Sequence, residues 1–352
     1  MSMHKITIDS NIEHFKDSYV KTMSNKGKGS RSEALLNKLI TNIKCGNIIV
    51  LDSAYDVIPY IQKLKERYYA LLIAHPKDFP AIELSFNSII PTKDIANVKL
   101  RKVKDRNGNT LVTPKNLFLY EEIVKCLRYD YIRTKVFPTI MRQIGVKTCV
   151  YCNAQFAITT KANQTFYQLD HFYPKSRYPY LSGSFFNLQP CCSSCNLHKL
   201  DNDEMTHGKY NISMWKEMDD DEDDLYKFEI DSASLANYQI NQDRDVLLMK
   251  FLAANSSLAE TVKLAEKMDK TFKLSQLYNE HSDVAEEIIW KKQIYSKSYI
   301  DSLKEAFGTA YGDLSSDFDR FIIGTYLDKR DIYKRPLAKF IQDITEQLHF
   351  EI

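Results

Sequence analysis

Four cysteines in two pairs are the residues whose spacing most directly predicts chemistry in this chain. The pairs are Cys149 with Cys152 and Cys192 with Cys195, each with two residues between its members. That spacing lets the backbone curl so that both sulfur atoms reach one tetrahedral ion, and two such pairs complete a four-thiolate, structural zinc site. Cys191 is an alternative ligand to its neighbour Cys192, but it lacks the two-residue spacing to Cys195.

The apolar segments bear on the cellular compartment, and the compartment in turn bears on the state of the cysteines. The start of the chain, residues 1–12, is polar and has no apolar signal-peptide core, and the longest apolar stretches are far too short to cross a bilayer. We therefore expect a cytoplasmic protein that does not associate with membranes and whose thiols stay reduced. Cys45 and Cys126 each stand alone in a helical stretch, and we expect both to pack in the core.

Side chains suited to phosphodiester hydrolysis lie between and just after the cysteine pairs. His171 is a candidate general base, because imidazole accepts a proton near neutral pH. Asp170 and Asn196 offer hard oxygen ligands, which suit a Mg²⁺ or Mn²⁺ ion that neutralises charge on the phosphate. Adjacent residues on a strand point to opposite faces, so a twist or strand end must bring Asp170 and His171 together. Lys199 lies three residues after Asn196, on the same face of a helix, and is expected near the phosphate.

The order Asp-His, Asn-Leu, then Cys-Asn-x-x-Lys, interleaved with Cys-x2-Cys pairs, resembles the zinc-stapled HNH endonucleases with a ββα-metal fold. The resemblance implies that Asp170 and Asn196 bind the catalytic metal and that His171 is the general base. It also implies that Asn187 braces the loop between the two strands and orients the histidine. Lys199 matches a common basic position of the family. An asparagine at the third motif position favours Mg²⁺ or Mn²⁺ over a catalytic zinc.

The wider phrase at residues 170–176 and the helical flanks are similar to HNH proteins of bacterial phage-defence systems, including the nuclease subunit of Septu. This resemblance implies a hydrolase that cuts DNA in antiviral defence and works with a partner ATPase. Two alternatives stay open, namely an HNH nuclease that acts on RNA and a zinc ribbon that binds nucleic acid or protein without cutting. The zinc ribbon explains the cysteines, but it does not explain Asp170-His171 together with Asn196.

Charge gives weaker indications than the motifs. The chain has 48 basic and 46 acidic side chains, so nucleic-acid binding has to depend on local charge. Lys175, Arg177 and Lys209 are candidate phosphate contacts, although solvated side chains would look the same. His198 should point away from the face of Asn196 and lie at the surface or near DNA. The basic segment 99–109 ends in an Asn-Gly turn signal, for which a solvated surface turn is favoured over a phosphate-binding hairpin.

We predict an α+β, mostly α-helical fold in which a small ββα-metal core with its four-cysteine zinc site is flanked by helical regions. The expected regions are a mainly helical segment for partner or DNA binding (1–140), the nuclease domain (141–216), an acidic linker with a short strand (217–240) and a helical region (241–352).

Capping residues and apolar stripes give the expected helices. Ser32 and Ser53 are expected to cap the first two, the second with a stripe over residues 57–71. Further helical stretches are expected at 116–143, interrupted near Pro138, and from Asp243 onward, with apolar stripes over 258–268 and 295–306. The six acidic residues 219–224 are expected to form a solvated linker, and residues 227–230 a strand.

Overall fold

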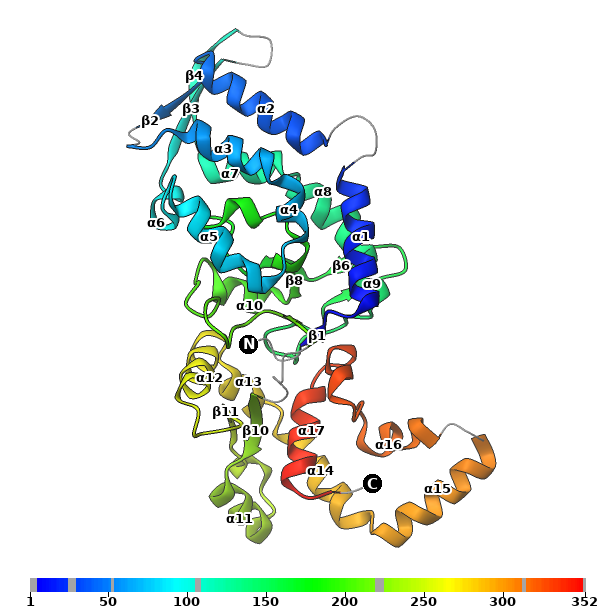
Figure 1. Ribbon diagram of the computed structural model, residues 1–352. Helices are drawn as coiled ribbons and strands as arrows, with labels where there is room; N and C mark the ends of the chain where they lie inside the picture. The colour runs from blue at the N-terminus through cyan, green and yellow to red at the C-terminus, as the bar shows by residue number, and fades with distance from the viewer. Residues whose placement is uncertain are drawn as a thin grey trace.

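The structure of the protein is a computed structural model that describes residues 5–24, 30–51, 54–104, 109–218, 225–311 and 315–350. Helices dominate these residues, and five small sheets lie among them. The N-terminal helices form one end of the molecule, the cysteine-rich segment lies in the middle, and the C-terminal helices form the other end (Figure 1). The predicted α+β, mostly helical fold is confirmed. Within the described residues, no helix is long and apolar enough to span a membrane.

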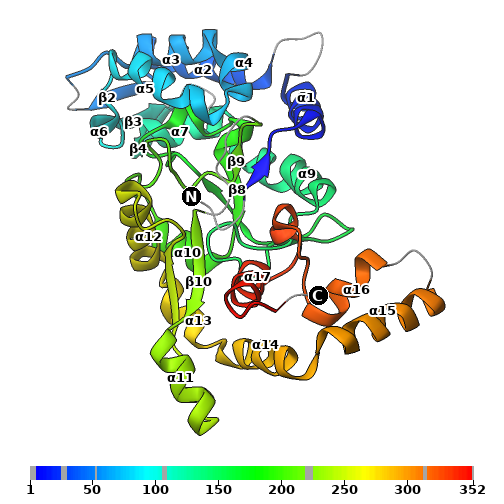
Figure 2. The same cartoon turned by 60° about the horizontal axis from the view of Figure 1, so that its bottom comes forward.

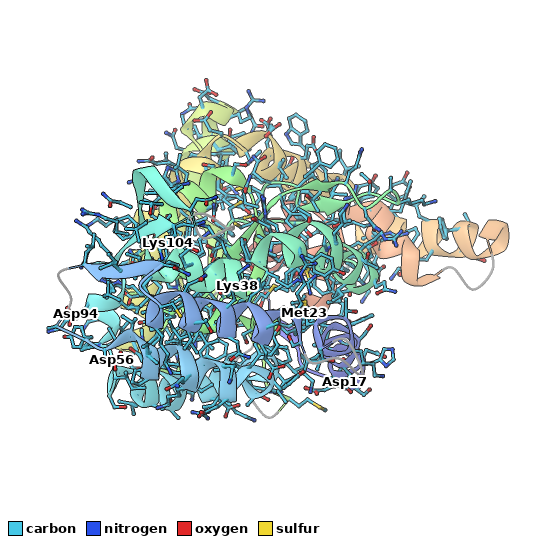
Figure 3. The ribbon with its side chains drawn as sticks, turned by 90° about the horizontal axis from the view of Figure 1, so that it is seen from above. Asp17, Met23, Lys38, Asp56, Asp94 and Lys104 are labelled. Atoms are coloured by element: carbon cyan, nitrogen blue, oxygen red, sulfur yellow. The ribbon has the colours of Figure 1, made fainter. Side chains whose placement is uncertain are left out.

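The N-terminal region packs helices beside a three-stranded antiparallel sheet. The strands, in the spatial order β2-β3-β4, are β2 (Ile48–Leu51), β3 (Lys99–Lys104) and β4 (Thr110–Phe118). The helices are α1 (Ser10–Ser24), α2 (Arg31–Lys44), α3 (Val57–Glu66), α4 (Tyr68–Ile73), the 3-10 turn η1 (Pro76–Asp78), α5 (Phe79–Asn87) and α6 (Thr92–Ile95). Figure 3 shows this region from above, with Met23 near the end of α1 and Lys38 on α2. The basic segment forms the β3–β4 hairpin, while its Asn-Gly signal lies outside the described residues.

The two helices for which Ser32 and Ser53 were predicted as caps, α2 and α3, have other N-cap residues. The N-cap of α2 is Ser30, whose hydroxyl accepts a hydrogen bond from the Ser32 amide at 3.1 Å, while Glu33 accepts one from the Ser30 amide at 3.1 Å. This reciprocal capping box places Ser32 inside the helix, where it is buried. Ser53 lies outside the described residues, and Asp56 caps α3. The predicted stripe over 57–71 is buried, but it is divided between α3 and α4.

The stretch 116–143 is less uniformly helical than predicted. Its first residues belong to β4, and four helical pieces follow, namely α7 (Leu119–Cys126), α8 (Tyr129–Tyr131), the π-helical turn η2 (Ile132–Val136) and α9 (Phe137–Ile144). The break after α7 lies at Arg128, which has a left-handed conformation with φ 61°. Pro138 lies in the first turn of α9, where its missing N–H costs no helical hydrogen bond.

The central segment contains a two-stranded antiparallel sheet followed by a helix. Strands β7 (Gln168–His171) and β8 (Leu188–Cys191) pair so that Asp170 faces Gln189 and His171 faces Leu188. Helix α10 (Ser193–Lys199) follows at once, which gives the ββα order that the motif predicted. The other elements are the hairpin β5 (Ile158–Thr159) and β6 (Thr165–Phe166) and the 3-10 turns η3 (Pro179–Leu181) and η4 (Phe185–Asn187).

The C-terminal region contains strands as well as helices. The predicted strand at 227–230 is confirmed as part of β10 (Tyr226–Ile230), and it pairs with β11 (Met249–Ala253). The prediction of helical structure from Asp243 onward was therefore wrong for the residues before α12, which include β11. The elements are α11 (Ser232–Asn241), the 3-10 turn η5 (Arg244–Val246), α12 (Ala259–Phe272), α13 (Leu274–Asn279), α14 (Ser282–Ile294), α15 (Lys297–Tyr311), α16 (Ser315–Ile323), the 3-10 turn η6 (Lys329–Lys334) and α17 (Ala338–Gln347). Helices α15 and α16 project from the body (Figure 2).

The predicted apolar stripes of this region are only partly buried. In α12 the buried face includes Ala265 and Met268, but Leu258 is the exposed N-cap, because the helix begins one residue later. In the stripe over 295–306, Tyr299 of α15 is 48% exposed, whereas Tyr295 and Leu303 are half-buried against the core. The acidic residues 219–224 lie outside the described residues.

The N-terminal region is joined to the central segment by strand pairing, and the C-terminal region is joined to it by hydrogen bonds of one side chain. Strand β1 (Ile6–Thr7) pairs in parallel with β9 (Trp215–Lys216). On the C-terminal side, buried Asn153 has a left-handed backbone with φ 52°. Its side-chain Nδ2 donates to the Ile332 carbonyl at 3.0 Å and to the Thr148 hydroxyl at 3.1 Å. Its side-chain Oδ1 accepts from the Lys339 backbone amide at 3.1 Å. One side chain thus connects the first cysteine pair to the start of α17.

We expect Asn153→Ala to lower the free energy of unfolding by about 2–3 kcal/mol, because three buried hydrogen bonds are lost at about 1 kcal/mol each. Urea denaturation measures the change. Asn163→Ala is the matched control, since Asn163 has a similar left-handed φ of 58° but is exposed. Equal losses for the two variants would mean that backbone strain alone, and not the connection to α17, sets the cost.

Candidate functional site: a four-cysteine metal site beside an HNH cavity

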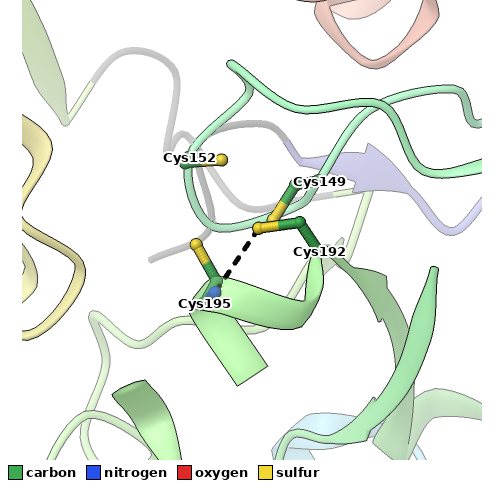
Figure 4. Close-up of side chains that lie close together, drawn as sticks. All are labelled: Cys149, Cys152, Cys192 and Cys195. Atoms are coloured by element: carbon green, nitrogen blue, oxygen red, sulfur yellow. Dashed lines mark hydrogen bonds between the residues drawn. The ribbon is translucent and has the colours of Figure 1, made fainter. Parts of the chain in front are cut away.

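The four predicted cysteines converge. The sulfur atoms of Cys149, Cys152, Cys192 and Cys195 all lie within 4.8 Å of one another, and all four residues are buried (Figure 4). Within the described part of the chain, this is the single group of three or more His, Cys, Asp or Glu residues that is close enough to hold a metal ion. The donor set therefore fits a closed, structural metal site.

Local backbone structure and electrostatics both favour metal binding by the cluster. Cys192 is the N-cap of α10, and its Sγ accepts a hydrogen bond from the Cys195 amide at 3.4 Å. Hydrogen bonds from the thiols of Cys149, Cys152 and Cys195 lower the pKa of Cys192, which favours its thiolate. Thiolates are the form that binds metal.

The other cysteines lie outside the cluster. Burial raises the pKa of the Cys191 thiol, and its Sγ lies 3.7 Å from the Gln168 carbonyl oxygen. Cys191 is thus a neutral, buried thiol, and Cys192 takes the place in the cluster. Cys126 is buried in the core as predicted. The prediction of a core position for Cys45 was wrong, because Cys45 is exposed at the end of α2.

Three of the four predicted catalytic residues line one cavity of about 760 Å³, and Asn187 is not among its lining residues. Asp170 and His171 reach it from the end of β7, and Asn196 reaches it from α10. Asp170 and His171 are buried, while Asn196 is half-buried. The cavity thus brings together an imidazole, a carboxylate and an amide that are separate in sequence.

His171 is held by its surroundings in one orientation. Its Nε2 lies 3.2 Å from the Ser182 carbonyl oxygen, so Nε2 is the nitrogen that carries the proton. The Tyr129 ring packs on the imidazole with centroids 4.5 Å apart. Burial, with a smaller contribution from the positive charge of Lys175, lowers the pKa of His171 to about 3. The imidazole is therefore neutral at pH 7, and its Nδ1 lone pair is available to accept a proton.

Asn187 lies in the segment between β7 and β8, at the end of η4. Its Oδ1 accepts a hydrogen bond from the Tyr173 amide at 2.7 Å, and its Nδ2 donates to the carbonyls of Tyr173 and Leu181 at 3.2 and 3.0 Å. Its side chain is fully buried. These contacts close the loop that carries Ser182, the hydrogen-bond partner of His171.

Lys199 lies in a different place from the one expected near the phosphate. It is buried, and its Nζ is 2.9 Å from Oδ2 of Asp170 and 2.7 Å from the His171 carbonyl oxygen. The Tyr151 hydroxyl donates to the same Asp170 oxygen, and Gln189 Nε2 donates to Tyr151 at 2.5 Å. Burial, then the charge of Asp170, raises the pKa of Tyr151, so the phenol remains a donor. Two donors on Oδ2 leave Oδ1 as the oxygen for another ligand.

We expect Lys199→Met to lower the free energy of unfolding by about 3 kcal/mol, because it leaves the buried Asp170 carboxylate without its cation. The double variant Asp170→Asn/Lys199→Met should recover part of the loss, since neither charge then remains. Lys175→Met is the matched control at an exposed lysine and should change stability little. Wild-type stability of Lys199→Met in urea denaturation would contradict the buried ion pair.

The remaining predicted cations are not all at the cavity. Lys175 lines it and lies 5.0 Å from the centroid of Tyr129. Arg177 pairs instead with Asp203 at 2.5 Å, and Lys209 lines a different cavity. His198 is exposed on α10 and lies outside the catalytic cavity.

The opposite wall of the cavity comes from the N-terminal region and was missed by the sequence analysis. Lys125 of α7, Arg128 at the break before α8 and Arg133 of η2 line it. With Lys175 these cations equal the number of lining carboxylates, which are Glu121, Asp130, Asp170 and Asp201. A bound divalent cation would therefore give the cavity a net positive charge, which suits a phosphate.

Comparison with known protein families identifies this part of the chain. Residues 149–203 match the family described as HNH endonuclease, and the match spans the metal cluster, both strands and α10. This segment carries the HNH endonuclease motif, which confirms the resemblance noted in its sequence. The match indicates a metal-dependent nuclease that binds nucleic acid. No curated protein and no solved structure matches the chain.

Proposed function

We propose that the protein is an endonuclease that hydrolyses phosphodiester bonds of DNA by a one-metal mechanism with His171 as the general base. The observation that carries this proposal is the shared cavity of Asp170, His171 and Asn196 inside the HNH-matching segment. The four cysteines would hold a structural Zn²⁺ beside it.

The catalytic cation would be Mg²⁺ or Mn²⁺, because a carboxylate and an amide are hard oxygen ligands. Asp170 would bind it through Oδ1, and Asn196 through its side-chain oxygen. Once bound, such a cation neutralises the charge that builds on the scissile phosphate and the leaving oxygen.

His171 would perform the proton transfer. Its Nδ1 takes a proton from water while the water oxygen forms a bond to phosphorus and the bond to the leaving oxygen breaks in line with the attack. The hydrogen bond from Nε2 to the Ser182 carbonyl leaves Nδ1 as the ring nitrogen that can accept a proton. Lys175 and the arginines of the opposite wall would hold the nucleic-acid backbone.

Cleavage assays with and without chelator test this proposal on both nucleic acids. The expected result is cutting of DNA that requires Mg²⁺ or Mn²⁺. Cutting of RNA alone would replace DNA by RNA as the substrate, since the phosphate chemistry is shared. Binding of nucleic acid with no cutting under any metal, with or without partner proteins, would favour the non-catalytic zinc ribbon.

The proposed setting is bacterial anti-phage defence, in which a partner ATPase controls the nuclease. The support is the similarity of residues 170–176 and of the helical flanks to the HNH proteins of such systems. Affinity purification of the full chain from its own cells tests the setting. Recovery of an ATPase that raises the cleavage rate is expected, and a cleavage rate that the recovered ATPase does not change would contradict this control.

A further inference from the structure

A second cavity, of about 540 Å³, lies at the junction between the first cysteine pair and the C-terminal region. Its walls combine aromatic and cationic side chains, and no carboxylate of the described residues lines it. The aromatic and cationic lining residues are Lys147, Phe156, Arg320, Tyr326, Lys334 and Arg335. This composition differs from the catalytic cavity, where carboxylates and cations are equal in number.

The floor of this junction cavity is fixed by backbone hydrogen bonds. The Lys147 amide donates to the Tyr333 carbonyl at 2.9 Å, and the Ala157 amide donates to the Lys147 carbonyl at 2.8 Å. Phe156 pairs with Thr148 in the same short bridge. The cavity is therefore built jointly by the bridge that flanks the first cysteine pair and by η6 with the residues that follow it, and Asn153 connects the two.

The cations of this cavity fall into two groups. Arg320 and Lys334 lie 5.2 and 5.5 Å from the Tyr326 ring centroid, and Lys334 also pairs with Asp331 at 2.7 Å. Tyr326 thus organises these two side chains. Lys147 and Arg335 are exposed and have no side-chain partner among the described residues. Two uncompensated cations on a rigid floor are suited to an anion.

Phe156 adds a flat apolar surface to these charges. Its side chain is 59% exposed and has no ring partner within the described residues. An exposed aromatic ring beside unpaired cations is the arrangement by which proteins stack an unpaired base while binding its phosphate.

We propose that the junction cavity binds a nucleotide unit of single-stranded nucleic acid, with the base on Phe156 and the phosphates at Lys147 and Arg335. This inference rests on the proposed function, because a nuclease has to hold the strand that it cuts. The test measures binding rather than cleavage, so the two proposals fail separately. Loss of cleavage with intact binding at the junction would contradict only the nuclease.

The experiment uses the full chain with His171→Ala as background and a labelled single-stranded DNA oligonucleotide, followed by fluorescence anisotropy. Phe156→Ala should weaken binding about tenfold through loss of base stacking. Lys147→Ala/Arg335→Ala should make the slope of log Kobs against log salt shallower by about 1.4, because about 0.7 is lost for each single-strand phosphate contact. Melting temperatures verify that the variants are folded.

Matched controls separate this cavity from general surface charge. Phe166→Ala removes an aromatic ring that is 64% exposed but lies outside the cavity, and Lys270→Ala removes an exposed lysine on α12. Both should leave affinity unchanged. Unchanged binding by Phe156→Ala and by the double variant would overturn the proposal.

Two competitors identify the source of the ligand. A nucleoside monophosphate that displaces the oligonucleotide only when Phe156 is present supports the same chemistry and makes a free nucleotide the ligand. A polyglutamate peptide that competes as well as the oligonucleotide, independently of Phe156, would mean an unspecific anion surface and would overturn base stacking.

Discussion

Replacing His171 by alanine should lower the rate of DNA cleavage by about 100- to 10,000-fold, the range typical for loss of a general base. Binding of DNA should change little, because the cationic walls of the cavity stay in place. The His171 ring is buried against Tyr129, so the variant also loses some packing. Its melting temperature therefore has to be measured, and its cleavage rate has to be read well below that temperature.

His198→Ala is the matched control for this loss. Both histidines belong to the HNH-matching segment, but His198 is exposed on α10 and lies outside the catalytic cavity. We expect His198→Ala to cut at about the wild-type rate, because it accepts no proton in the proposed mechanism. Equal rates for His171→Ala and wild type, or a greater loss for His198→Ala, would require a different base.

The metal cluster was predictable because its information is local. The Cys-x2-Cys spacing depends on a few consecutive backbone torsions, so each pair could be identified without knowing the fold. The choice of Cys192 over Cys191 followed from the same spacing, and the structure agrees with it. The ββα order was predictable for the same reason, since the motif fixes the sequence of its elements.

The surroundings of the catalytic residues were not predictable in this way. Helical spacing put Lys199 on the face of Asn196 and near the phosphate, but spacing does not show burial, so the ion pair with Asp170 was missed. Tyr151 was counted only as a residue between two cysteines. Its hydrogen bond to Asp170 and its stacking on Phe272 depend on packing between segments far apart in sequence.

The walls of the cavities show the same limit at larger scale. Arg128 enters the catalytic cavity because the helical stretch breaks there into a left-handed residue, and no local signal had indicated this break. Asn153 connects the first cysteine pair to Ile332 and Lys339, which are far away in the sequence. Contacts of this kind depend on the tertiary fold, which periodicity and capping signals do not specify.

Removal of the proposed structural zinc should unfold the central segment and abolish cleavage. We expect Cys192→Ser to lose about one zinc per chain and to lower the melting temperature by roughly 5 °C, which corresponds to a loss of about 4 kcal/mol for a chain of 352 residues. The physical reason is that Cys192 both caps α10 and is one of the four clustered thiols that would hold the ion. Metal analysis and thermal denaturation measure the two effects.

Cys191→Ser is the matched control, because Cys191 is an equally buried neighbour that lies outside the cluster. It should keep its zinc. If Cys191→Ser lost the zinc and Cys192→Ser kept it, the ligand assignment would be reversed, and if both kept it, the cluster would not be a metal site. The proposed zinc should also affect cleavage, because Tyr151 lies between two of the clustered cysteines and Asn196 directly follows a third. Cys192→Ser should therefore lose zinc, stability and cleavage together, whereas His171→Ala should lose cleavage and retain the zinc.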